Sequence, residues 1–257
     1  MSRTAKLDLS SAFDLSGERV LITGGGTGLG FGMARCFLAA GAAVVVAGRR
    51  EPVLREAVRR LGDRADYRVY DVTAGDEAEY FVSSLEKDSG PITVLVNNAG
   101  IHHRKSLEET TLEEFRRLWE VHVMGGLALS RAVAPRMKEA GGGSILFMAS
   151  MASFFGIPST TAYSAAKTSL LGVVRVLSSE LAPSGIRVNA IAPGWIDAGM
   201  GRMPDAERRK QIIARTPVGR FGQAEDVGWT AVFLSSPAAR FITGICLPVD
   251  GGVSGAF

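Results

Sequence analysis

Short apolar runs and helical segments alternate along this 257-residue chain, and the alternation limits the folds open to it. The run 43–47 is apolar at every position, which is typical of a strand that helices cover on both faces. The segments between such runs repeat their apolar residues at helical spacing. Parallel strands need crossovers of this kind, whereas antiparallel strands can be joined by short turns. The sequence therefore predicts an α/β fold with one doubly wound parallel sheet.

Seven strands are expected, at 19–23, 43–47, 67–71, 93–97, 144–149, 187–191 and 245–249. Helices are expected after the glycines that follow the first strand and at 52–61, 76–87, 111–138 and 161–181. The length and a hydrophobic content of 46% fit a single domain over 17–257, after an N-terminal arm at 1–16. Within that domain, 193–222 loosens into Gly, Pro and charged residues around an amphipathic piece at 205–214, which predicts a substrate lid.

Charge and cysteine usage exclude several classes of protein. The 29 basic and 26 acidic residues are scattered, without the basic stripe that nucleic-acid binding needs, so no nucleic-acid partner is expected. Cys36 and Cys246 match neither a metal-ligand spacing nor a disulfide framework, which predicts free thiols and no metal site. No apolar run is long enough to span a bilayer, and 1–16 lacks the apolar core of a signal peptide. These features predict a cytoplasmic protein without a membrane partner.

A glycine-rich segment follows the first predicted strand. It reads Thr23-Gly-Gly-Gly-Thr-Gly-Leu-Gly30, and a helix is expected directly after it. Glycines at such a junction permit a tight turn and let backbone amides approach a pyrophosphate at the helix N-terminus. A glycine cluster alone is also compatible with a plain turn, but a strand before it and a helix after it are the context that a dinucleotide-binding loop requires. The candidate cofactor residues here are Gly24, Gly26, Thr27, Gly28, Leu29 and Gly30.

Further motifs occur in order along the chain: Asn97-Asn-Ala-Gly100, Tyr163-Ser-Ala-Ala-Lys167, Pro193-Gly194 and Asp250-Gly-Gly252. Together with the TGxxxGxG spacing of the loop, they resemble the short-chain dehydrogenase/reductase family, and the resemblance covers the chain from Leu15 onward. It implies a Rossmann-like domain with strand order 3-2-1-4-5-6-7 and a homotetramer built on the fourth and fifth helices. It also implies an oxidoreductase that interconverts a secondary alcohol and a ketone.

The end of the second predicted strand bears on the choice of cofactor. NAD binders place a carboxylate there on the ribose diol, whereas NADP binders place cations on the 2′-phosphate. Gly48 occupies this position and Arg49 and Arg50 follow, which favours NADP(H) because a guanidinium binds phosphate bidentately. The alternative is that both arginines are solvated surface charges. By the resemblance, the adenine and its ribose are flanked by Asp71, Val72, Asn98, Ala99 and Gly100.

Tyr163 and Lys167 lie four residues apart, so on a helix they share one face. A nearby ammonium lowers the ordinary tyrosine pKa of about 10, which favours proton exchange between Tyr163 and a substrate oxygen. Such pairs are common on helix surfaces, and the prediction depends on their occurrence together with the glycine loop and the 97–100 segment. By the resemblance, Ser150 polarises the substrate carbonyl, Tyr163 and Lys167 also contact the cofactor, and Lys167 binds its nicotinamide ribose.

By the resemblance, Pro193, Gly194 and Ile196 belong to a turn that holds the nicotinamide carboxamide. Two residues depart from the family pattern. Ala198 stands where a threonine is usual, so a side-chain hydrogen bond to the cofactor is lost. His122 stands where an asparagine is usual; that asparagine holds a relay water through its backbone carbonyl, and its side chain stabilises a local helix irregularity. His122 is thus a catalytic candidate with an ordinary pKa of about 6.5, or else a packed helix histidine.

The expected small-molecule substrate is a sugar acid. The segment 102–105, His-His-Arg-Lys, places cationic and hydrogen-bonding groups just past the fourth strand, near the mouth of the site in this topology. With 13–17, 150–153 and 219–222, it resembles the gluconate 5-dehydrogenase and 2-deoxygluconate 3-dehydrogenase members of the family. The alternatives are that 102–105 is a solvated loop, that the enzyme is a 3-oxoacyl or broad-range ketone reductase, or that the chain is a dinucleotide-binding regulator.

Overall fold

The computed structural model describes residues 8–198 and 205–256 and contains a seven-stranded sheet whose neighbouring strands are all parallel. The strand order β3-β2-β1-β4-β5-β6-β9 confirms the predicted Rossmann-like order, because β9 is the seventh strand of this sheet. The strands are β1 Arg19–Thr23, β2 Ala43–Gly48, β3 Ala65–Val69, β4 Val94–Asn97, β5 Gly143–Met148, β6 Ile186–Pro193 and β9 Cys246–Val249.

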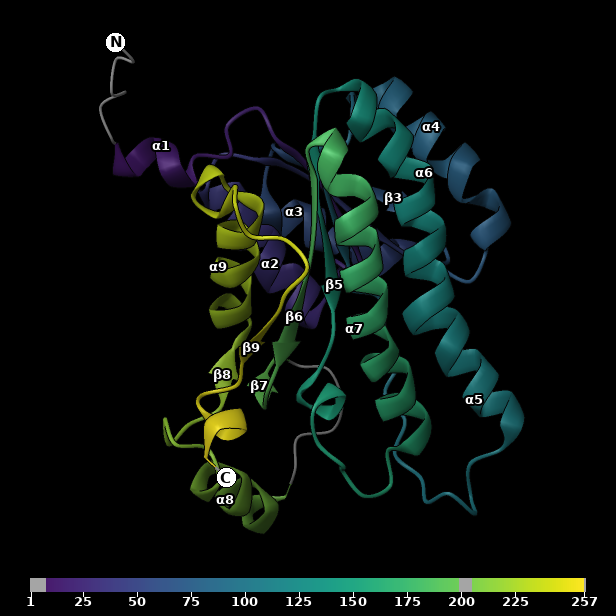
Figure 1. Ribbon diagram of the computed structural model, residues 1–257, viewed down its shortest axis with the longest axis vertical. Coiled ribbons are helices and arrows are strands. Elements are labelled where there is room, and N and C mark those ends of the chain that lie inside the picture. Colours follow the sequence, from purple (N-terminus) through teal and green to yellow (C-terminus); the bar gives the residue numbers. More distant parts are fainter. Residues whose placement is uncertain (1–7, 199–204, 257) are drawn as a thin grey trace.

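Helices connect the strands and cover both faces of the sheet (Figure 1). They are α1 Leu9–Phe13, α2 Gly28–Ala39, α3 Glu51–Leu61, α4 Ala78–Ser89, α5 Leu112–Trp119, α6 Gly125–Glu139, α7 Thr161–Leu181, α8 Ala206–Ala214 and α9 Ala224–Ser235. One apolar core lies between the sheet and α4, α6 and α7, and a second lies between the sheet and α2 and α9. Leu21 of β1 enters the first core and its neighbours Val20 and Ile22 enter the second, since successive strand side chains point to opposite faces.

Three elements differ from the expectations. The apolar pattern does not predict α9, because its buried Val227 and Leu234 are interleaved with the exposed Trp229 and no clean apolar stripe marks the helix. The long helix expected over 111–138 is α5 and α6 joined by a π-helical turn at Glu120–Met124. The third strand begins and ends two residues before the predicted 67–71.

The strand order reverses beside β1, whose neighbours are β2 and β4, and ligands of open α/β sheets bind at the carboxyl ends of strands around such a point. The predicted lid at 193–222 contains α8 and a short parallel pair, β7 (Ile196–Asp197) with β8 (Gly222–Gln223). Residues 199–204 of that segment and 1–7 of the predicted arm lie outside the described residues. In Figure 1, α8 and the C-terminus lie beyond the carboxyl end of β6.

Within the described ranges, no helix combines the length and apolar character needed to cross a membrane. Cys36 is buried, Cys246 is half-buried, and both are free thiols, as predicted. The same ranges hold no group of three or more His, Cys, Asp or Glu side chains placed to bind a metal.

Candidate active site

The glycine loop runs from the end of β1 to the start of α2, as predicted. Gly24 and Gly28 have φ angles of +65° and +57°, which favour glycine. A Cβ built on Gly30 would lie 2.4 Å from the Gly24 carbonyl oxygen and 2.7 Å from Asn98 Nδ2, so only glycine fits. Thr27, the residue before α2, makes no side-chain hydrogen bond to the helix. The loop therefore brings the N-terminal amides of α2 to the sheet edge without a side chain over them.

The segment after β4 is tied to this loop. The Thr23 hydroxyl accepts hydrogen bonds from the backbone amides of Asn98 (3.0 Å) and Ala99 (2.9 Å). The Asn98 side chain in turn donates from Nδ2 to the Thr23 carbonyl at 2.8 Å and the Gly24 carbonyl at 3.3 Å. The sequence motifs identify Asn98 as a site residue but not Thr23. Thr23 is the first residue of the glycine-rich segment, and that position could have identified it. Strands β1 and β4 thus present one rigid edge to a ligand.

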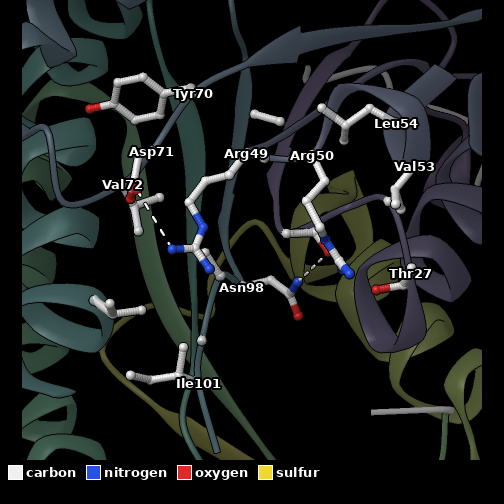
Figure 2. Close-up of a pocket in the computed structure, with 17 residues that line it drawn as sticks. Thr27, Arg49, Arg50, Val53, Leu54, Tyr70, Asp71, Val72, Asn98 and Ile101 are labelled. Atoms are coloured by element: carbon white, nitrogen blue, oxygen red, sulfur yellow. Dashed lines mark hydrogen bonds and ion pairs between the residues drawn. The ribbon is translucent and has the colours of Figure 1, made fainter. Parts of the chain in front are cut away.

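A pocket opens beside this edge, between the glycine loop and the ends of β2 and β3. Figure 2 shows Arg49 on the side of Asp71 and Val72, and Arg50 on the side of Thr27. The Arg49 guanidinium lies 3.8 Å from the Asp71 carboxylate in a partly exposed pair, while Arg50 has no ion pair within the described residues. Gly48, at the end of β2, brings no carboxylate into the pocket. Its other lining residues include Gly24, Gly26, Val53, Leu54, Tyr70, Asn98, Ala99 and Gly100.

The remaining predicted cofactor residues lie outside the lining of this pocket. Gly28 lines an adjoining hollow that also contains Asp197 and Ala198. Leu29 is partly buried and packs against the second apolar core. Pro193 ends β6 and is buried, and a Cβ on Gly194 would lie 2.7 Å from Asp250 Cα, so the family turn needs glycine there.

Tyr163 and Lys167 occupy the first two turns of α7. The Lys167 ammonium is buried, lies 5.7 Å from the centre of the Tyr163 ring, and donates to the Met148 carbonyl at 2.5 Å. Burial lowers the pKa of Lys167 to about 7. Burial also raises the pKa of Tyr163 above its ordinary value, which a hydrogen bond from the Ser150 hydroxyl opposes. The pKa lowering that the sequence predicts for Tyr163 is therefore outweighed by desolvation, and the free protein holds the tyrosine protonated.

Ser150 follows β5 directly and begins a short 3₁₀ turn, where its hydroxyl accepts a hydrogen bond from the Ala152 amide at 3.1 Å. The same hydroxyl reaches Tyr163, so the two oxygens predicted to hold a substrate carbonyl are brought together. Sequence reasoning does not identify the Met148 carbonyl as the partner of Lys167, because that contact depends on how α7 packs over β5.

The π-helical turn places His122 beside Tyr163, with ring centres 5.4 Å apart and planes at 88°. The His122 Nε2 atom lies 2.9 Å from the Ile101 carbonyl oxygen and 3.3 Å from the Ile101 amide nitrogen, and the tautomer of the ring decides whether Nε2 donates to the first or accepts from the second. Its Nδ1 atom is buried and has no hydrogen-bond partner among the described residues. Burial, followed by the charge of Lys167, lowers the pKa of His122 to about 3, against a weaker hydrogen-bond effect from Ile101. His122 is therefore neutral, and it does not titrate near 6.5.

The four side chains of the cationic segment 102–105 lie in three different places. The His102 ring lies edge-on to Tyr163 with ring centres 6.1 Å apart. Lys105 donates to Glu114 at 2.5 Å, and the His103 ring lies 3.9 Å from the same carboxylate. Arg104 instead lines a separate cavity with Met151. Only His102 and Arg104 of the predicted group thus face the catalytic end.

Comparison with known proteins agrees with this arrangement. A family model described as enoyl-(acyl carrier protein) reductase matches residues 24–254. Gluconate 5-dehydrogenase of Gluconobacter oxydans is 35% identical over 247 residues, covering 94% of this chain and 96% of that protein. The 3-oxoacyl-(acyl-carrier-protein) reductase of Thermotoga maritima is 33% identical, covering 93% of this chain and 98% of that protein. The chain belongs to the short-chain dehydrogenase/reductase family and is an oxidoreductase of the kind that acts on CH–OH groups with NAD(P).

One solved structure is especially relevant to the site. It is described as a gluconate 5-dehydrogenase from Burkholderia cenocepacia in complex with NADP and tartrate. It is 34% identical to this chain, with a TM-score of 0.93, and the match covers 97% of this chain and 100% of the other.

Proposed function

We propose that this protein is an NADP(H)-dependent oxidoreductase that interconverts the secondary alcohol and the ketone of a sugar acid, as a gluconate 5-dehydrogenase does. The observation that carries the proposal is that Ser150 and Lys167 both meet Tyr163, beside a cavity that Arg104 lines. We assign residues 17–257 to one catalytic domain, with 193–222 as its lid.

The pocket fits a dinucleotide that carries a 2′-phosphate. Gly30 and Gly24 leave the space that a diphosphate needs, and Arg49 and Arg50 supply cations where Gly48 supplies no acid. When bound, NADPH supplies a hydride to the substrate carbonyl carbon. We assign the adenosine side to Asp71, Val72, Asn98, Ala99 and Gly100, and the nicotinamide side to Lys167, Pro193, Gly194 and Ile196.

The proposed proton path uses residues of this chain. The Ser150 hydroxyl donates to the substrate carbonyl oxygen and polarises it. Tyr163, which burial keeps protonated, gives its proton to that oxygen in the reductive direction. The Lys167 ammonium favours the tyrosinate that remains. In the oxidative direction the same tyrosinate removes the proton from the alcohol.

The sugar-acid substrate is supported by two groups on the substrate side. His102 lies next to Tyr163, and Arg104 lines the adjoining cavity. The names of the Gluconobacter and Burkholderia relatives point to the same class of substrate. The test is NADPH oxidation with 5-ketogluconate and related keto acids beside neutral cyclic ketones. We expect turnover of the acids, and activity confined to apolar ketones would contradict the sugar-acid proposal.

A 3-oxoacyl or broad-range ketone reductase is the second candidate. It is favoured by the apolar residues Met151, Phe155 and Trp195 of the same cavity and by the Thermotoga relative. The same substrate panel separates the two candidates, provided that a 3-oxoacyl thioester is included. The alternative of a dinucleotide-binding regulator is set aside, because the chain belongs to a family of oxidoreductases.

We also propose a homotetramer in the cytoplasm, assembled through α5, α6 and α7. Large apolar side chains are exposed on α5 (Leu112), in the π-helical turn before α6 (Met124) and on α7 (Val176). Exposed apolar surface of this kind is usual at subunit contacts.

A further inference from the structure

A second cavity lies next to the catalytic residues, under α8. It adjoins them along the chain, because Met151 follows Ser150 and Trp195 lies between Gly194 and Ile196. It encloses about 880 Å³, which falls within the roughly 300–1,000 Å³ typical of small-molecule sites. The helix α8 covers one side of it, and residues near the C-terminus cover another.

The face that α8 presents to this cavity is cationic at both ends. Arg208, Gln211, Ile212 and Arg215 all line the cavity, and their spacing of three, four and seven residues places them on one side of the helix. Arg208 and Arg215 are thus about 10 Å apart along the axis, at 1.5 Å per residue. Arg104 adds a third guanidinium from the loop after β4, and no aspartate or glutamate is among the described residues that line the cavity.

Within the described part of the chain, these three arginines differ from Arg209 in forming no ion pair. Arg209, on another side of α8, lies 3.7 Å from the Asp197 carboxylate and over the Phe221 ring. Arg104, Arg208 and Arg215 form no ion pair within residues 8–198 and 205–256, and the sequence of 199–204 contains no aspartate or glutamate. Three like charges around one cavity repel one another, and an anion inside it would relieve that repulsion.

We propose that Arg208 and Arg215, with Arg104, bind the anionic end of the substrate, while its carbonyl lies at Tyr163. This inference rests on the proposed function and specifies it: the substrate is an open-chain keto acid whose acid group binds under α8, away from the reacting carbon. A guanidinium binds a carboxylate or a phosphate bidentately, so the shared requirement is an oxyanion. The apolar wall formed by Met151 and Trp195 strengthens such a contact by displacing water.

The test compares single-charge variants with charged and neutral substrates. Arg208→Gln and Arg215→Gln are assayed with 5-ketogluconate and with the neutral ketose fructose. Lys210→Gln is the matched control, because it removes one charge from an exposed position of the same helix that does not line the cavity. We expect each arginine variant to raise KM for the keto acid about tenfold, with kcat for that acid and the rate with fructose unchanged. Lys210→Gln should leave KM unchanged.

Inhibition by small anions gives a readout that does not depend on the true substrate. Tartrate and inorganic phosphate are added during reduction of a neutral ketone, with erythritol as the uncharged counterpart of tartrate. We expect tartrate to compete, erythritol not to compete, and Arg208→Gln to weaken tartrate inhibition about tenfold. Stronger inhibition by phosphate than by tartrate would identify a phosphorylated substrate and would overturn the keto-acid form of the inference.

The failures of the two proposals are distinguishable. If the wild type reduces 5-ketogluconate and the arginine variants match Lys210→Gln, the sugar-acid function stands and the subsite under α8 is refuted. If the wild type reduces only neutral ketones and tartrate does not inhibit, both are refuted. Circular dichroism of each variant excludes loss of fold as the cause of a raised KM.

Discussion

At the scale of single residues, the site is governed by burial as much as by charge. Lys167 and Tyr163 lose hydration on the same helix, so the pKa of Lys167 falls to about 7 and that of Tyr163 rises. Both shifts favour the neutral forms in the free protein. A protonated tyrosine is the state that carbonyl reduction requires, because it is the proton donor.

Arg49 is the residue on which cofactor preference depends most directly. Its guanidinium is only loosely paired with Asp71, at 3.8 Å, so it is available to a phosphate. We expect Arg49→Ala to raise KM for NADPH about 10- to 100-fold, since a charged hydrogen bond contributes about 1.5–3 kcal/mol, and to leave KM for NADH unchanged. Arg55→Ala, on the exposed side of α3, is the control. Equal use of NADH and NADPH by the wild type would rule out the preference.

His122 should not act as a proton carrier. Because its pKa is held to about 3, we expect no ionisation of His122 in the rate profile from about pH 5 to pH 9. We further expect His122→Asn to leave the shape of that profile unchanged, since a backbone carbonyl survives the substitution. Two results would contradict this expectation. One is an inactive wild type whose activity His122→Asn restores, and the other is an inflection of the wild-type rate profile near pH 6.5 that His122→Asn removes.

Stability gives an independent check on the same histidine. The folded pKa of about 3 lies below the ordinary value of 6.5, so the unfolded chain binds a proton first as the pH falls. The wild type should therefore lose stability between pH 6.5 and pH 3, by up to about 1.4 kcal/mol per pH unit. Urea unfolding of His122→Asn at pH 7 and pH 5 should show a smaller loss than the wild type.

At the scale of elements, α2 and α9 approach closely because each carries a glycine at the contact. A Cβ on Gly32 would lie 2.3 Å from Ala224 Cβ, and one on Gly228 would lie 2.6 Å from Cys36 Sγ. These helices lie far apart in sequence, so their packing is not visible to local patterns. The contact packs the start of α9 against the middle of α2.

Gly228→Ala tests this packing. Alanine raises helix propensity by about 1 kcal/mol, but overpacking of a tight core costs about 1–3 kcal/mol, and we expect the second effect to win. Urea unfolding should show a net loss of stability. Adding Cys36→Ala removes the Sγ atom and should recover part of the lost stability. If Gly228→Ala alone is more stable than the wild type, the two helices are not in close contact.

The sequence predicts the strands and most helices because their apolar runs are continuous and their junctions carry glycines. It fails at α9, which is buried against both α2 and the sheet, and at the two-residue shift of β3, whose Asp66 and Arg68 interrupt the apolar pattern. At the site, motif spacing identifies Ser150, Tyr163 and Lys167. The contact of His122 with Ile101 and that of Lys167 with Met148 depend on tertiary packing, which no local pattern reports.

At the scale of the whole molecule, the parallel sheet gathers strand ends from distant parts of the chain. The segments after β1, β2, β3 and β4 line the pocket proposed for the dinucleotide, and the segments after β5 and β6 contribute to the cavity proposed for the substrate. One edge of the sheet thus carries both sites, with α8 over the second. Under the proposed function, this arrangement lets a hydride donor and a carbonyl meet at Tyr163.

The assembly is tested at this scale. We expect light scattering after size-exclusion chromatography to give the mass of four chains. Replacing Val176, exposed at 56% on α7, by Glu should shift the species towards dimers or monomers, because a charge would enter an apolar contact. A wild type that runs as a monomer at micromolar concentration would refute the tetramer.

The most direct test of the central claim is the rate of NADPH oxidation with 5-ketogluconate by the wild type and by Tyr163→Phe. The substitution removes one oxygen and opens no cavity, so NADPH binding and the unfolding midpoint should match the wild type. We expect the wild type to turn over and Tyr163→Phe to lose about 10²–10⁴-fold in kcat, as removal of a general acid does. Tyr80→Phe, at an exposed position of α4, controls for loss of a phenol. A Tyr163→Phe variant with nearly wild-type turnover would contradict the account.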